Sequence, residues 1–130
     1  VISRIFLTLP NRMTEKITPL KDYWEQRKEV HQIIKHLYIC NYFQAKNKAK
    51  LRELQISHVL LCAKELEPCY PAGVVFKQLA IVDVPHQDIT QHFDDVFAFI
   101  DDALSANDTM PVTKKNNNVL VHCAAGVSRS

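Results

Sequence analysis

The fold is decided by the stretch Val119-Leu120-Val121-His122-Cys123-Ala124-Ala125-Gly126-Val127-Ser128-Arg129-Ser130. Its first three residues form an apolar run that is typical of a buried strand. Cys123 follows the run, and Arg129 comes after five intervening residues. A loop of this kind can turn its backbone N–H groups inward to bind an anion. The stretch therefore predicts a buried strand that leads into a phosphate-binding loop.

Cys123 and Arg129 are the residue types that a cysteine-based phosphate-ester hydrolase requires. The planar guanidinium of Arg129 can hold two phosphate oxygens at once. Positive potential at the loop favours the thiolate of Cys123, the form that attacks phosphorus. The chain contains only two glycines, and one of them, Gly126, lies inside the loop where backbone must approach a ligand. The alternative is an ordinary turn that follows a strand and a buried structural cysteine.

The HCxxGxSRS ending resembles the signature of the protein tyrosine phosphatase superfamily, and within it the dual-specificity phosphatases. The resemblance extends upstream to the strand-like stretches 34–40, 57–63 and 76–84, although glycine is commoner in the family where Cys40 stands. It covers roughly residues 33–130, and residues 1–30 match no family pattern. The implied fold is α/β, with a central, mostly parallel sheet flanked by helices.

The resemblance also assigns roles to the loop residues. Cys123 is implied as the nucleophile, Ser130 as a donor to its sulfur, and His122 as a brace of the loop rather than a proton carrier. The phosphate is expected to be bound by Ala124, Ala125, Gly126, Val127, Ser128 and Arg129. Neither a metal nor another cofactor is expected, because the loop itself supplies the positive field.

A general acid must protonate the leaving oxygen, and two aspartates precede the last predicted helix. Dual-specificity phosphatases place their acid six residues before the aliphatic residue that opens this helix. Counting back from Ile89 gives Asp83, at the expected end of a strand. Asp88 is the alternative acid, but it also fits the N-cap of the helix, with Gln91 at the third position of a capping box.

The expected substrate is a phosphoprotein, because the loop positions Ala124, Ala125 and Val127 are small or apolar. Phosphoinositide and nucleic-acid members of the superfamily tend to carry polar or basic residues there. A module that binds phosphoproteins without turnover is a second alternative, disfavoured by the presence of Cys123, Arg129 and Asp83 together. Phosphotyrosine and phosphoserine or phosphothreonine are both retained as targets.

Composition favours one compact domain: 47% of the 130 residues are hydrophobic, 23% are charged and the net charge is +2. No apolar stretch reaches the roughly 20 residues of a membrane span, and no basic stripe indicates nucleic-acid binding. The four cysteines lack metal-site spacing, which favours a reducing, intracellular location, in the cytoplasm or nucleus. The oligomeric state is left open.

The chain has no initiator methionine and ends within its motif, so we expect a fragment of a longer product. Residues 1–30 are expected to be a flexible lead-in. Residues 31–130 are expected to be a catalytic domain that is truncated after its phosphate loop, lacks the following helices and has little activity alone.

Further elements are predicted from the patterns along the chain. They are a strand pair around 33–39, a basic helix over 43–55, strands over 59–62 and 74–82, a helix over 89–104 and a polar loop over 109–118. The lysines of the basic helix are expected to form a solvated face, with substrate docking as the alternative.

Overall fold

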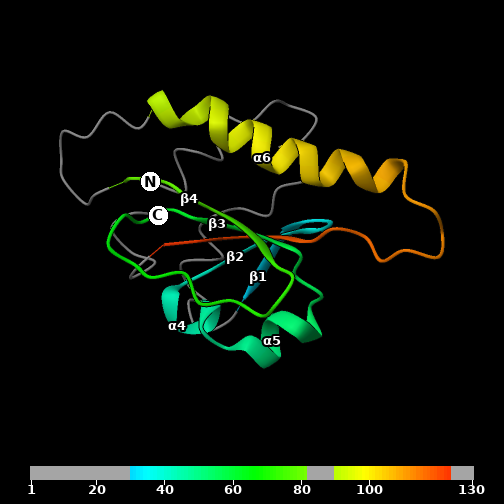
Figure 1. Ribbon diagram of the computed structural model, residues 1–130, viewed down its shortest axis with the longest axis horizontal. Coiled ribbons are helices and arrows are strands. Elements are labelled where there is room, and N and C mark those ends of the chain that lie inside the picture. Colours follow the sequence, from blue (N-terminus) through cyan, green and yellow to red (C-terminus); the bar gives the residue numbers. More distant parts are fainter. Residues whose placement is uncertain (1–29, 82–89, 124–130) are drawn as a thin grey trace.

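The computed structural model describes residues 30–81 and 90–123, which form a sheet covered by helices on both faces (Figure 1). The strands of this described part are β1 (His31–Ile34), β2 (Leu37–Cys40), β3 (His58–Leu61), β4 (Val75–Gln78) and β5 (Val119–His122). Their order is β1-β2-β5-β3-β4, with β1 antiparallel to β2 and the other pairs parallel. The sheet is mostly parallel, as the sequence predicts.

The helices are divided between the two faces of the sheet. Helix α6 (Phe93–Ser105) crosses one face, and the short helices α4 (Tyr42–Ala45) and α5 (Lys48–Glu53) cover the other (Figure 1). The 3-10 helices η1 (Thr90–His92) and η2 (Ala106–Asp108) lie at the two ends of α6. The chain then returns through residues 109–118 to β5, the middle strand of the sheet.

The central strand β5 contributes to both hydrophobic cores because successive side chains of a strand point to opposite faces. Val119 and Val121 pack in the cluster that includes Val96 and Ile100 of α6. Leu120 packs in the cluster on the other face, with Leu51 of α5. A strand buried on both faces needs a continuous apolar run, which explains why the pattern at 119–121 does not alternate.

The basic segment over 43–55 forms two helices, not the single helix that its sequence predicts. Helix α4 ends at Ala45, and α5 begins at Lys48. The side chain of Asn47 accepts a hydrogen bond from the Lys50 N–H group at 3.1 Å, which makes Asn47 the N-cap of α5. A short amide side chain competes for backbone hydrogen bonds in this way, so it starts a new helix instead of continuing the old one.

Helix α6 begins later than its apolar periodicity predicts. The 3-10 turn η1 occupies residues 90–92, so Gln91 lies in that turn, and the residue before the first turn of α6 is His92, without a side-chain cap. The predicted capping box begins at Asp88, which lies outside the described residues. Tightening of a helix end into a 3-10 turn shifts the start of the α-helix without changing its apolar face. Val96 and Ile100, two of the apolar residues that recur at helical spacing, are buried as predicted, and Ala103 is buried beside them.

The stretch over 74–82 forms a shorter strand than predicted. Strand β4 ends at Gln78, so the expectation that this strand runs to Asp83 is wrong. Gln78 Nε2 lies within hydrogen-bond distance of three backbone carbonyls, those of Ala63, Lys64 and Leu66, at 2.9, 3.1 and 2.7 Å. β4 pairs with β3 alone among the described strands, which leaves Val75 and Phe76 about half exposed. Buried apolar residues continue beyond the strand, at Leu79 and Ile81.

Candidate active site

The carboxyl ends of β2, β5 and β3 meet at one edge of the sheet. Cys40, the last residue of β2, pairs with His122, the last residue of β5. The N–H group of Cys62, directly after β3, donates to the carbonyl oxygen of His122 at 2.8 Å. Cys123 follows β5, so this edge collects three of the four cysteines. Parallel α/β sheets bind their ligands outside this edge, and this is where the predicted nucleophile lies.

The three cysteines at this edge are buried, on different faces of the sheet. Cys62 and Cys123 belong to the core that faces α6, and Cys40 belongs to the core that faces α5. Burial raises the pKa of the Cys40 and Cys62 thiols, and the neighbouring Cys123 adds to the rise in both. Cys40 and Cys62 are therefore neutral thiols at neutral pH and poor nucleophiles.

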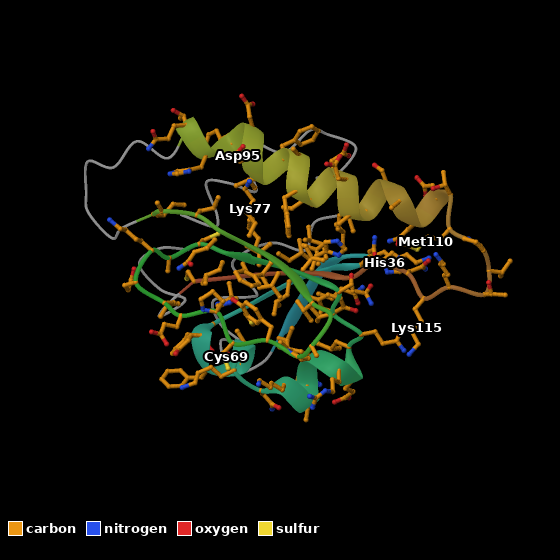
Figure 2. The ribbon with its side chains drawn as sticks, viewed as in Figure 1. His36, Cys69, Lys77, Asp95, Met110 and Lys115 are labelled. Carbon is orange, nitrogen blue, oxygen red and sulfur yellow. The ribbon has the colours of Figure 1, made fainter. Side chains whose placement is uncertain are left out.

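The fourth cysteine is set apart from this group. Cys69 lies in the loop between β3 and β4, on the side of the sheet where α4 lies, and it is exposed to solvent (Figure 2). It neither follows a buried strand nor precedes an arginine in the signature spacing. Its surroundings offer none of the features that make a cysteine a phosphate-ester nucleophile.

His122 is buried, with 2% of its surface exposed, and contacts polar atoms at both ring nitrogens. Its Nε2 atom lies 2.7 Å from the hydroxyl of Tyr70, and its Nδ1 atom lies 3.3 Å from the carbonyl oxygen of Cys123. Burial lowers the pKa of His122 to about 4, although the backbone hydrogen bond to Cys123 acts in the opposite direction. The imidazole is therefore neutral at neutral pH.

Tyr70 is a site residue that the sequence analysis does not identify. It lies in the loop after β3, 52 positions before His122, between Pro71 and the exposed Cys69. Its ring packs edge-on against His122, with the ring centroids 5.8 Å apart, and at a tilt against Phe76 of β4, with the centroids 5.6 Å apart. No local pattern in the sequence indicates that this tyrosine reaches β5.

The remaining predicted site residues lie outside the described ranges. These are Asp83 and Asp88 in the stretch before η1, and Ala124, Ala125, Gly126, Val127, Ser128, Arg129 and Ser130 after β5. The structure therefore brings together Cys123 and His122 of the predicted set, and their assignments to chemical roles stay predictions.

A cavity of about 490 Å³ lies at the opposite end of the sheet. Its lining comes from the end of α5, the turn over 71–74 that precedes β4, and residues 115–117 that precede β5. Figure 2 shows Lys115, one of the lining residues, at the end of the sheet where His36 also lies. Because all these segments precede their strands, the cavity is remote from Cys123 and is not the predicted phosphate pocket.

The family follows from comparison with known proteins. Residues 37–130 match the family model described as dual specificity phosphatase, catalytic domain. The chain belongs to this family, since the match spans well over half of its length. This confirms the resemblance drawn from the HCxxGxSRS ending.

Curated relatives agree with the match. The chain is 37% identical over 106 residues to dual specificity protein phosphatase 1B of Arabidopsis thaliana. This alignment covers 82% of this chain and 58% of that protein. It is 35% identical over 102 residues to MAP kinase phosphatase with leucine-rich repeats protein 3 of Dictyostelium discoideum. That alignment covers 76% of this chain and 10% of that protein. The chain thus spans little more than half of the first relative and a tenth of the second.

Solved structures confirm the α/β fold. The crystal structure of DUSP15 aligns with a TM-score of 0.63 at 25% identity, over 77% of this chain and 58% of that one. A human tyrosine phosphatase-like serine/threonine/tyrosine-interacting protein aligns with a TM-score of 0.63 at 26% identity, over 79% of this chain and 67% of that one.

Proposed function

We propose that the protein is a cysteine-dependent protein phosphatase that hydrolyses phosphotyrosine, and phosphoserine or phosphothreonine, in proteins. The observation that carries this proposal is the place of Cys123. It follows the central, fully buried strand of a mostly parallel sheet, at the carboxyl edge, and begins the signature of the family to which the chain belongs. A nucleophile that follows a rigid strand is held in a fixed position relative to its substrate.

The proposed reaction has two steps and uses two side chains of the signature, Cys123 and Arg129, together with the upstream acid Asp83. In the first, the Cys123 thiolate attacks phosphorus, the bond to the leaving oxygen breaks, and Asp83 gives its proton to that oxygen. In the second, water attacks the phosphocysteine while the Asp83 carboxylate takes its proton, and the thiolate leaves. Arg129 stabilises the charge on the phosphoryl oxygens throughout.

The other signature residues support these steps. Ser130 donates to the departing sulfur, and the backbone N–H groups of residues 124–129 bind the phosphoryl oxygens. His122 braces the loop, a role that its neutral, buried imidazole supports. The neutral thiols Cys40 and Cys62 take no part in bond making.

We infer a phosphorylated protein as the partner and the cytoplasm or nucleus as the location. Cys40, Cys62 and Cys69 are free thiols, as is usual in a reducing compartment. Within residues 30–81 and 90–123, no helix is both long enough and apolar enough to cross a membrane. The uncharged loop positions 124, 125 and 127 favour a protein substrate over a phosphoinositide.

The deciding experiment compares Cys123→Ser with Cys69→Ser in the full-length protein. Cys123→Ser is expected to abolish turnover of phosphopeptides and to leave their binding largely intact, since the oxyanion-binding groups remain. Cys69→Ser is expected to retain full turnover. Trapping the phosphoenzyme on any other cysteine would overturn the assignment.

A substrate panel then tests the class of the reaction. Peptides that carry phosphotyrosine, phosphoserine or phosphothreonine are compared with inositol phospholipids in vesicles. Faster turnover of the phosphopeptides is the expected result. Binding of phosphopeptides without turnover would identify a binding module instead, and preferential turnover of the lipids would identify a phosphoinositide phosphatase.

A further inference from the structure

Tyr70 and His122 form a hydrogen-bonded pair directly behind the predicted nucleophile. The hydroxyl of Tyr70 lies 2.7 Å from Nε2 of His122, and Nδ1 of the same ring lies 3.3 Å from the carbonyl oxygen of Cys123. The Tyr70 ring is in turn held between His122 and Phe76. The Tyr70 hydroxyl, the His122 ring and the Cys123 carbonyl therefore form a hydrogen-bonded chain from the loop before β4 to the backbone of the predicted nucleophile.

The chemistry of the two contacts fixes the direction of both hydrogen bonds. A carbonyl oxygen can only accept, so the Nδ1 atom of His122 must carry the proton and donate to Cys123. A neutral imidazole then has only a lone pair at Nε2, and the Tyr70 hydroxyl must donate to it. Burial raises the pKa of Tyr70, so the phenol keeps the proton that it donates.

We propose that Tyr70 is a positioning residue of the active site. Its hydroxyl stabilises the His122 tautomer with the proton on Nδ1, and this tautomer donates a hydrogen bond to the Cys123 carbonyl. This inference rests on the proposed function of Cys123. The carbonyl of Cys123 belongs to the peptide plane that leads into the expected phosphate loop, and a planar peptide moves as one unit. Without the Tyr70 hydroxyl, the buried Nε2 atom loses its donor, and the ring no longer strongly favours the tautomer that grips the carbonyl.

A double-mutant cycle separates this role from packing. Tyr70→Phe keeps the ring contact with Phe76 and removes only the hydroxyl, and we expect kcat to fall about 10-fold, which corresponds to one hydrogen bond of about 1.4 kcal/mol. In a His122→Asn background, the asparagine amide can donate to the carbonyl without help from Tyr70. There Tyr70→Phe is expected to change kcat less than twofold.

Tyr38→Phe is the matched control, because Tyr38 packs on the same core, whereas the hydrogen bond and the ring contact to His122 come from Tyr70. It is expected to leave kcat unchanged. An equal loss from Tyr70→Phe in both backgrounds would show that Tyr70 acts through packing, and no loss in either would show that its hydroxyl has no positioning role. Either result overturns the inference.

A spectroscopic measurement tests the pair without any turnover. The ¹⁵N chemical shifts of His122 in the full-length protein are expected to show a protonated Nδ1 and an unprotonated Nε2. In Tyr70→Phe, both shifts are expected to move toward the values of a mixture of the two neutral tautomers. A protonated Nε2 in the unsubstituted protein would overturn the inference even if Cys123 is the nucleophile. Failure of the proposed function itself is a separate result: the Cys123→Ser variant would then keep full turnover.

Discussion

His36 and Asn118 are joined by a hydrogen bond of 2.7 Å between Nδ1 of the histidine and Oδ1 of the asparagine, 82 residues apart in the chain. Asn118 immediately precedes β5, and its Nδ2 atom also donates to the carbonyl oxygens of Leu54 and Gln55 at 3.0 and 3.2 Å. This one buried amide thus ties the β1–β2 turn and the end of α5 to the entry of the strand that carries Cys123.

Replacing Asn118 with alanine should therefore destabilise the fold. The change removes hydrogen bonds to three buried or half-buried groups, so the free energy of unfolding should fall by about 1–3 kcal/mol. Urea denaturation followed by circular dichroism measures it. Asn116→Ala, at an exposed position, is the control and should change stability by no more than about 0.5 kcal/mol. Equal losses would show that the Asn118 side chain has no special role.

Stability should depend on pH through His122. Above pH 6.5 its ring is neutral in both states and has no effect. As the pH falls from 6.5 to about 4, the unfolded chain binds a proton that the folded protein excludes, so the free energy of unfolding should fall, by at most about 3 kcal/mol. His58, whose pKa burial also lowers, acts in the same direction. Urea titrations at pH 7, 6 and 5 should show a shallower decline for His122→Asn, and identical slopes would contradict the prediction.

The cysteines should differ sharply in their reaction with iodoacetamide. Cys69 is exposed and should be alkylated within minutes in the folded protein, whereas Cys40 and Cys62 are buried neutral thiols and should resist. Peptide mass spectrometry after timed alkylation gives the order. In urea all of them should react at similar rates. Rapid labelling of Cys40 before unfolding would show that the carboxyl edge of the sheet opens.

Asp83→Asn should reduce turnover of peptide or alkyl phosphate esters by about 10²-fold or more, because their leaving oxygens need a proton. The loss should be smaller for an activated aryl phosphate, whose leaving group is stable as an anion. Steady-state kinetics with both substrates measures the contrast. Asp88→Asn is the matched variant and should retain turnover. A larger effect at position 88, or equal losses for both substrates at position 83, would assign the acid elsewhere.

Features that depend on neighbouring residues could be predicted from the sequence. The apolar run at 119–121 has to be buried on both faces, and β5 proves to be the central strand. The spacing of Val96, Ile100 and Leu104 places them on one side of a helix, and α6 packs that side on the sheet. The signature that begins at His122 identified the family for the same reason, since its chemistry needs a strand, a cysteine and an arginine in one short stretch.

Features that depend on partners far along the chain were decided by the tertiary structure. The exposure of Val75 and Phe76 follows from the place of β4 outside β3, which no local pattern encodes. The role of Asn118 follows from contacts 63 to 82 residues away. Tyr70 reaches His122 only because β3 and β5 lie side by side in the sheet. Periodicity records which face of an element is buried, but the partner that a polar side chain meets there is set by how the elements pack.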